Sequence, residues 1–185
     1  PDAIPGDVNP VAHAWHTKNR VAWVPDNSGF YYTRCRRAAP AGEARFNHKL
    51  YFHHLGDDWR NDPLVFGESL KREQTPYPQL SSDGRYLVVV VQDVSVAAPC
   101  SQLYLLDRED QQRGFLPVIR GIEAFITAAF HRDRLYIQTN HQAPLGKLTV
   151  IKLADIAAGE FAAATAIPEG SCPLRAWTTV GDYLF

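Results

Sequence analysis

Short apolar runs alternate along this chain with polar turns that carry Asp and Gly. The most regular example is Leu80–Gln92, with the sequence LSSDGRYLVVVVQ. An Asp-Gly pair is typical of a tight turn, because the Asp side chain accepts a backbone hydrogen bond and Gly adopts a positive φ. The aromatic residue and the valines that follow predict a buried β-strand.

Three further stretches repeat this order of turn and strand, and two more apolar elements follow in each complete unit. The copies of the turn and strand are Trp23–Tyr32, Phe130–Gln138 and Trp177–Phe185. The second elements are Lys49–Leu55, Gln102–Asp107 and Lys147–Leu153, and the third are Pro63–Gly67, Phe115–Gly121 and Ala162–Gly170. The units recur at about fifty residues, which is a period typical of propeller blades.

We therefore predict an all-β chain, a β-propeller fragment of about three and a half four-stranded antiparallel blades. The blades are expected at roughly residues 11–68, 77–121 and 124–170, with a partial blade at roughly 174–185. Because each blade buries its neighbour's apolar face, an incomplete ring would leave two faces and the edge at Tyr183–Phe185 uncovered. We expect the chain to be part of a longer protein. When isolated, it should either associate through these edges or be ordered only inside a larger molecule.

In the first unit, strands are predicted at Phe30–Arg34, Leu50–Leu55 and Leu64–Phe66. The charged stretch Ser69–Gln74 is a candidate helical turn. Pro1–Pro10 is rich in Pro, Gly and Asp, and we interpret it as a connection between blades.

Three other segments are harder to assign to a type of secondary structure. The polar, basic segment Arg34–Arg45 is interpreted as a solvated hairpin loop, with a binding loop as the alternative. Leu153–Ala166 is a candidate short helix, since its alanines favour helix although Gly159 interrupts the pattern. The partial blade is expected to provide the strands Leu174–Trp177 and Tyr183–Phe185.

Composition limits the classes of partner. The net charge of -1 gives no electrostatic reason to expect nucleic acid or an anionic membrane surface. No apolar run approaches the ~20 residues of a membrane-spanning helix, and no signal peptide is visible at Pro1. The hydrophobic content of 45% and aromatic content of 11% are ample for a packed core.

Cys35, Cys100 and Cys172 are widely spaced and odd in number. We interpret them as free thiols in a reducing compartment, which predicts a cytoplasmic location. The alternative is one disulfide with a spare thiol, as in a periplasmic or secreted protein.

Residues with metal-binding side chains do not form a convincing site. His53-His54 are adjacent on a predicted strand, so one is expected to be buried and the other exposed. His13 and His16 lie three apart without a nearby carboxylate pattern. The acidic runs Asp57-Asp58 and Asp107–Asp110 coincide with expected turns and lack the alternating oxygen spacing of a calcium loop. The sequence predicts no metal site and no cofactor.

A nucleophilic serine is also not recognisable. Such a serine typically lies in Gly-x-Ser-x-Gly at a strand-to-helix elbow. Ser69 follows Gly67 but lacks the second glycine, and Ser81-Ser82 belong to the Asp-Gly turn. No Gly-rich phosphate loop occurs, so we predict no catalytic residue in this chain.

The ordered set of motifs resembles the N-terminal propeller of the prolyl oligopeptidase family of serine peptidases. The matching segments are W-x-x-D-x-x-G-F-Y-Y at Trp23–Tyr32, H-K-L-Y-F-H-x-L-G at His48–Gly56, D-P-L-V-F at Asp62–Phe66 and L-S-x-D-G-R-Y-L-V-V at Leu80–Val89. Tyr136–Leu148 is similar to that family's T-N-x-x-A-P-x-x-R/K-L segment. The matches span about Trp23–Leu153. The ordered set is more specific than a single D-G-R-Y turn, which many propellers carry.

The resemblance implies a parent protein in which a seven-bladed propeller caps an α/β-hydrolase domain. That domain would carry the catalytic Ser, Asp and His and would be the intramolecular partner of this chain. None of the catalytic residues maps onto this sequence. Arg34–Phe46, Val94–Ser101 and His131–Arg134 depart from the family pattern, which leaves the subfamily open. Any preference for proline also stays open, because the substrate pocket lies elsewhere.

Three functions follow from these observations. In the first, the chain is a propeller segment that restricts access of peptide substrates to a Ser-His-Asp active site, so that short peptides enter and folded proteins do not. The second is a stand-alone protein–protein interaction propeller without enzymatic activity, and the third is a non-peptidase hydrolase with the same cap. Gly-x-Ser-x-Gly in a longer reading frame would support the first or third, and its absence would favour the second.

Overall fold

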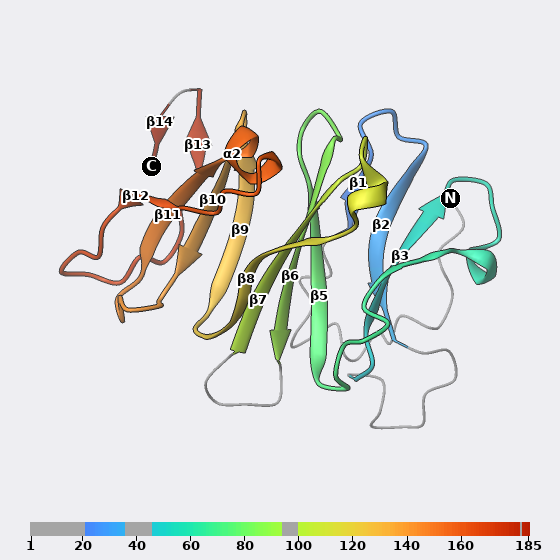
Figure 1. Cartoon of the computed structure of the whole chain (residues 1–185), viewed down its shortest axis with the longest axis horizontal. Helices are drawn as coiled ribbons and strands as arrows, with labels where there is room; N and C mark the ends of the chain where they lie inside the picture. Colours follow the sequence, from blue (N-terminus) through green and yellow to red (C-terminus); the bar gives the residue numbers. More distant parts are fainter. Residues whose placement is uncertain (1–20, 36–45, 94–99, 182) are drawn as a thin grey trace.

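The computed structural model describes residues 21–35, 46–93, 100–181 and 183–185. They form three four-stranded sheets that lie side by side in chain order, followed by a two-stranded ribbon (Figure 1). The helical elements in this part of the chain are α2 (Leu153–Ala157) and the 3-10 turns η1 (Trp59–Asn61) and η2 (Gln111–Arg113). The chain is therefore all-β and forms part of a β-propeller.

Every sheet is an antiparallel meander with its strands in sequence order. The first comprises β1 (Ala22–Trp23), β2 (Gly29–Arg34), β3 (Lys49–His54) and β4 (Leu64–Phe66). The second comprises β5 (Gln74–Leu80), β6 (Tyr86–Asp93), β7 (Cys100–Asp107) and β8 (Leu116–Glu123). The third comprises β9 (Ile126–His131), β10 (Arg134–Thr139), β11 (Lys147–Lys152) and β12 (Ala164–Ile167), and the ribbon pairs β13 (Thr179–Val180) with β14 (Tyr183–Leu184).

The Asp-Gly turn between β5 and β6 has the predicted geometry. Asp83 Oδ1 accepts a hydrogen bond from the amide of Arg85 at 3.0 Å, and Gly84 has a φ of 76°. In the turn between β1 and β2 the positive φ belongs to Asn27 instead. Gly29 is required there for another reason, because a Cβ at this position would lie 2.3 Å from the carbonyl oxygen of His53 on β3.

The valine-rich strand β6 is buried on both faces. Leu87, Val89 and Val91 belong to the apolar cluster that joins the second sheet to the first. Val88 and Val90 point the other way and belong to the cluster shared with the third sheet. This explains why the run does not alternate with polar residues, since the strand has no solvated face.

The turns of the first two sheets also interlock. A Cβ added at Gly84 would lie 2.6 Å from Cδ of Pro25, so the two turns are in close contact. Arg108 Nε donates a hydrogen bond to the hydroxyl of Tyr31 at 2.9 Å, and its Nη1 donates to the carbonyl of Gly84. Backbone packing and side-chain hydrogen bonds therefore fix the second sheet against the first.

Two local predictions are wrong. Ser69–Gln74 forms no helical turn: separate hydrogen-bonded turns close at Leu70 and Gln74, and Gln74 begins β5. The side chain of Gln74 accepts from the amide of Lys71 at 3.0 Å, which closes the second turn. Leu174–Trp177 is not a strand, because Leu174 bonds to Leu145 of the preceding loop instead of to a ladder partner.

The short helix predicted within Leu153–Ala166 is present as α2. It ends where Gly159 adopts a φ of 84°. The amide of Gly159 donates to the carbonyl of Ile156 at 2.9 Å and that of Glu160 to Asp155 at 2.8 Å. A glycine in this conformation commonly terminates a helix, because it satisfies the last carbonyls without steric strain.

The three cysteines are free thiols, as expected: Cys35 is buried, Cys172 is exposed and Cys100 is intermediate. Within the described ranges no helix is long and apolar enough to cross a membrane. The predictions for Pro1–Pro10, for His13 and His16 and for most of Arg34–Arg45 lie outside the described residues.

Candidate functional site

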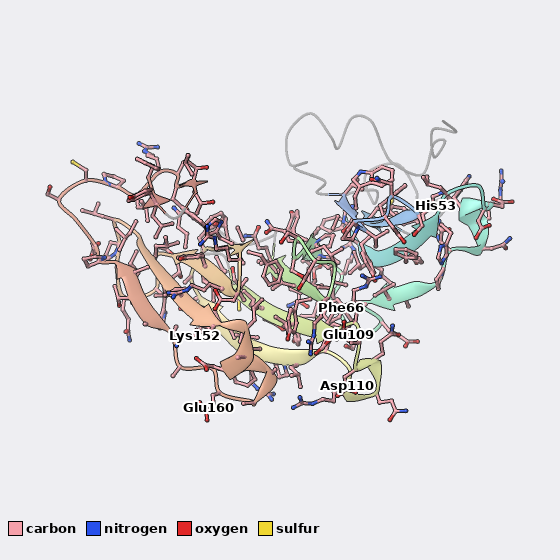
Figure 2. The ribbon with its side chains drawn as sticks, turned by 90° about the horizontal axis from the view of Figure 1, so that it is seen from above. His53, Phe66, Glu109, Asp110, Lys152 and Glu160 are labelled. Carbon is pink, nitrogen blue, oxygen red and sulfur yellow. The ribbon has the colours of Figure 1, made fainter. Side chains whose placement is uncertain are left out.

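The paired histidines of β3 lie on opposite faces of the first sheet, as predicted from strand alternation. His53 is buried and His54 is exposed. His53 is on the face opposite to the one that packs on the second sheet. Figure 2 shows it at one end of the molecule, far from Lys152 and Glu160 at the other.

His53 belongs to a buried polar trio. Its Nδ1 lies 3.0 Å from Oδ1 of Asp62, and the hydroxyl of Tyr32 donates to Oδ2 of Asp62 at 2.6 Å. The side chain of Asp62 is only 3% exposed, so its carboxylate needs these donors. Burial, and then the hydrogen bond to Asp62, raise the pKa of the Tyr32 phenol. The trio stabilises the entry to β4.

The sequence does not identify Tyr32 and Asp62 as partners of His53. Asp62 lies nine residues further along the chain, and no local motif links the two. The pairing depends on how the η1 segment folds back onto β3. Asp58 caps η1 by accepting from the amide of Arg60 at 3.0 Å, and this turn signal was the only indication available in the sequence.

A small acidic cavity of about 190 Å³ lies beside the trio. Its lining residues are His54, Asp57, Asp58, Asn61, Asp62 and Pro63. Asp58 is bonded to Arg60 and Asp62 to the trio, so two of the carboxylates already have protein partners. In the part of the chain that the structure describes, no group of three or more His, Cys, Asp or Glu residues could hold a metal ion.

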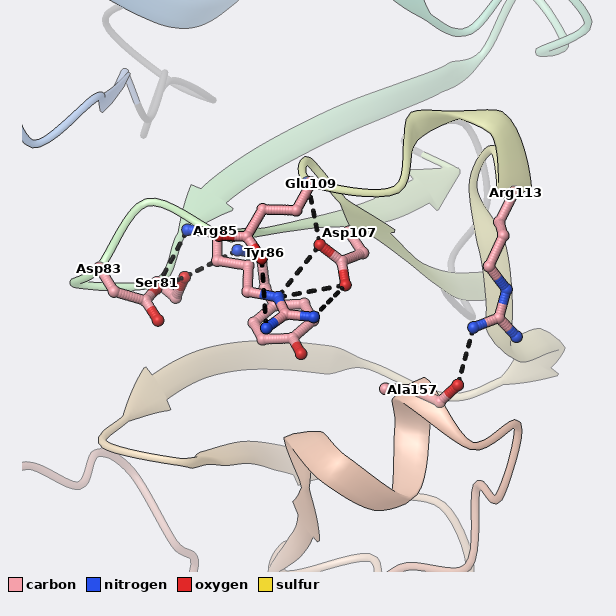
Figure 3. Close-up of polar contacts among 8 residues, drawn as sticks. All are labelled: Ser81, Asp83, Arg85, Tyr86, Asp107, Glu109, Arg113 and Ala157. Carbon is pink, nitrogen blue, oxygen red and sulfur yellow. Dashed lines mark hydrogen bonds and ion pairs between the residues drawn. The ribbon is translucent and has the colours of Figure 1, made fainter.

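The acidic run after β7 serves an ion-pair network (Figure 3). Arg85 Nη2 lies 2.8 Å from Oδ2 of Asp107, and its Nη1 lies 3.3 Å from Glu109. The hydrogen bond from Arg85 lowers the pKa of Asp107 below its usual value. These contacts join the start of β6 to the end of β7. Asp107 and Glu109 are therefore both ion-paired with Arg85.

The serines singled out from the sequence are also structural or exposed. Ser81 is buried, and its Oγ donates to Asp83 at 2.5 Å and accepts from the amide of Tyr86 at 2.8 Å. Ser69 is exposed in the turn that follows β4. Both hydrogen bonds of the Ser81 hydroxyl thus lie within the turn.

The first strands of the three sheets define a different kind of site. β1, β5 and β9 are the first strands and lie at one edge of their meanders, and β5 contacts both β1 and β9. A cavity of about 390 Å³ opens between β1 and β5. Val21 and Trp23 on its wall are 44% and 49% exposed. The side chains that line the cavity are apolar apart from that of Gln79.

A recurring hydrogen bond holds these first strands in place. A side chain near the end of each second strand donates to a carbonyl of the next unit: Thr33 to Pro76 at 2.6 Å, Gln92 to Ile126 at 2.9 Å and Gln138 to Leu174 at 2.7 Å. On the outer side, Arg113 of η2 donates to the carbonyl of Ala157 in α2 at 2.8 Å (Figure 3). The second and third sheets are thus hydrogen-bonded to each other at both their inner and outer sides.

Comparison with known proteins gives one family. The family model described as the prolyl oligopeptidase N-terminal beta-propeller domain matches residues 9–185. The prolyl endopeptidase of Elizabethkingia meningoseptica is 28% identical over 168 residues, which is 89% of this chain and 23% of that protein. The prolyl endopeptidase of Elizabethkingia miricola is 28% identical over 127 residues.

Solved structures show the same fold. A prolyl endopeptidase, from a study of inter-domain dynamics in catalysis and specificity, superposes with a TM-score of 0.75 at 23% identity and covers 89% of this chain. Prolyl oligopeptidase B from Galerina marginata, without ligand, gives a TM-score of 0.66 at 22% identity over 85% of this chain. The chain spans 24% and 21% of those two proteins, respectively.

Proposed function

The chain belongs to the prolyl oligopeptidase family, whose N-terminal β-propeller domain it forms in part, and we propose that it restricts which substrates reach a serine-peptidase active site elsewhere in the protein. The active site in this proposal is a Ser-His-Asp triad in an α/β-hydrolase domain. That domain is the intramolecular partner of the propeller, and the substrates are short peptides.

The arrangement of the first strands carries this proposal. Three successive sheets place β1, β5 and β9 next to one another and their later strands progressively outward. When such sheets continue around an axis, their first strands enclose a passage. The edges of β1 and β5, with Val21 and Trp23 exposed beside them, would then form part of the wall of that passage.

Such a passage acts by steric exclusion. An extended peptide is a single strand in cross-section and can pass, whereas a folded domain cannot. Acyl transfer would be performed by the triad of the hydrolase domain, in which the serine attacks and the histidine transfers protons. The described part of this chain would contribute the wall, at the cavity between β1 and β5.

The curated relatives favour the peptidase over the other two functions, since both are prolyl endopeptidases. A serine-directed fluorophosphonate probe separates the alternatives in the full-length protein. Labelling together with cleavage of a prolyl-peptide reporter supports the peptidase. Labelling without peptide cleavage would point to a different hydrolase, and the absence of labelling would favour an interaction propeller.

The exclusion itself is tested with one cleavable sequence in two settings. We expect the full-length protein to cleave it in a short peptide, and not when the same sequence lies in an exposed loop of a stable carrier protein. Unfolding and alkylating the carrier should restore cleavage, because an extended chain can pass. Equal cleavage of the folded carrier and the free peptide would refute the filter.

A further inference from the structure

The first strand of the first sheet has an exposed edge. Val21, just before β1, and Trp23 within it are 44% and 49% exposed, whereas no residue of β5 or β9 is exposed. β1 pairs with β2 on one side, and its other side is the free edge of the sheet. The cavity of about 390 Å³ lies beside this edge and is lined by Val21, Ala22 and Trp23 together with Pro78, Gln79 and Leu80. A ligand in the cavity can therefore reach the edge of β1.

The backbone groups of Trp23 face this free edge. In an antiparallel ladder, alternate residues direct both backbone groups toward the partner strand, and the residues between them direct both groups away. The amide of Val24 donates to the carbonyl of Gly29 on β2 at 3.1 Å, so Val24 faces β2. Its neighbour Trp23 consequently directs its N–H and C=O away from β2. Within the described ranges, no turn or loop residue pairs with these two groups.

A row of aromatic rings ends at the same residue. Directly opposed residues of an antiparallel pair have their side chains on one face, and the register opposes His53 to Phe30 and Phe30 to Trp23. The ring centroids are 5.2 Å apart for the first pair and 4.8 Å apart for the second. Trp23 lies at the free edge, so its indole is the last ring of the row. A residue that paired with Trp23 from an added strand would have its side chain next to this indole.

We propose that the free edge of β1 binds an extended segment of a substrate peptide, with an aromatic residue of the peptide opposite Trp23. This inference rests on the proposed function, because it assumes that peptides travel past the first strands. The N–H and C=O of Trp23 bond to the peptide backbone, as happens when a peptide extends a sheet. Those bonds are independent of the peptide's sequence, and the row of rings adds the preference for an aromatic side chain.

Two labelled peptides and the full-length protein test the preference. Both peptides are proline-free and rich in threonine, and they differ only in a central Phe or Ala. By fluorescence polarisation, we expect the Phe peptide to bind about twofold to tenfold more tightly, and Trp23→Ala to abolish this difference. The matched control Trp177→Ala also removes a tryptophan that packs on a ring, that of Tyr136 at 5.4 Å, and should retain the difference. Equal affinities in the wild type, or an equal loss in the control, would overturn the inference.

A backbone-methylated peptide tests the strand pairing. Methylation of the amide of the central Phe removes the donor that would bond to the carbonyl of Trp23. We expect the affinity of the wild type to fall by about threefold to tenfold. An unchanged dissociation constant would show that the peptide does not pair with β1, and the inference would fail.

Photocrosslinking locates the peptide without a variant, which keeps the inference testable if Trp23→Ala does not fold. Benzoylphenylalanine replaces the central Phe, and the crosslinked residues are identified by mass spectrometry. We expect crosslinks to the cavity lining, at residues 21–23 or 78–80. Crosslinks confined to other segments, or none, would overturn the inference.

These measurements follow binding and not cleavage, which separates this inference from the proposed function. A preference for the Phe peptide in a protein that does not discriminate by substrate size would retain the site on β1 and refute the filter. Size discrimination without that preference would do the reverse.

Discussion

Asp83→Ala should lower the free energy of unfolding by about 0.5–2 kcal/mol, the range known for side chains that cap backbone amides. The carboxylate accepts from the amide of Arg85 at 3.0 Å and from the hydroxyl of Ser81 at 2.5 Å. Ser81 is only 4% exposed, so the loss of its acceptor is costly. Asp83 itself is exposed. Water can therefore replace part of what is lost, which keeps the expected change within this range.

The same substitution should change how stability depends on pH. The hydrogen bond from Ser81, followed by that from the amide of Arg85, lowers the pKa of Asp83 below the ordinary value of 3.8. A carboxylate with a depressed pKa in the folded state contributes its full stabilisation above its unfolded pKa, and that contribution is lost as the pH falls through the folded pKa. The difference between the wild type and Asp83→Ala should therefore shrink as the pH falls from about 5 toward 3.

Urea unfolding of the dilute, isolated chain, followed by tryptophan fluorescence, measures both effects. Asp83→Asn keeps an acceptor oxygen without the charge, so we expect a smaller loss. Asp26→Ala is the matched control, because Asp26 makes the same contacts to Ser28 in the preceding turn, where both residues are exposed. An unchanged midpoint for Asp83→Ala, or a loss no larger than that of Asp26→Ala, would refute the reasoning.

Four further outcomes are expected. Gly84→Ala should lower the free energy of unfolding in urea by about 1–3 kcal/mol more than Gly56→Ala does. Both glycines have a positive φ, but only a Cβ at Gly84 would clash, because a ring atom of Pro25 lies 2.6 Å away. Equal losses for the two variants would argue against the contact between the turns. Asp62→Ala should cost about 2–4 kcal/mol and Asp62→Asn less, since His53 loses its buried acceptor; equal midpoints for these two variants would contradict that account. The isolated chain should not hydrolyse a prolyl-peptide reporter, and turnover abolished by mutation of one of its serines would show otherwise. At micromolar concentration it should sediment as an oligomer, because apolar side chains including Phe185 are exposed; a stable monomer with a cooperative melt would disprove this.

The fold could be predicted because its signals are local. The Asp-Gly turn at Ser82–Gly84 and the valines of Leu87–Val91 specify a turn and a buried strand without reference to distant residues. The recurrence of that pattern then indicated stacked sheets. The helix α2 was visible for the same reason, since its alanines and Gly159 lie within one short segment.

The polar contacts between units could not be predicted, because they join residues far apart in the chain. Gln92 and Ile126 are separated by 34 positions, and Thr33 and Pro76 by 43. A glutamine at the end of a strand is usually solvated, and nothing adjacent to Gln92 marks it as a donor to the next sheet. The trio around Asp62 was missed for the same physical reason.

The hydrogen bond that recurs between units also bears on Leu174–Trp177, which was predicted as a strand and is not one. Thr33 and Gln92 each hold a carbonyl of the following sheet's first strand, and Gln138 holds that of Leu174 in the same manner. Leu174 is thus bonded to the third sheet as a first strand would be, and its amide is bonded to Leu145. A strand assignment also requires a second strand paired alongside, and the described residues supply none for this segment. The hydrogen bond between units therefore forms at Leu174 although no described strand pairs with this segment. This implies that the second strand of each unit positions the first strand of the next.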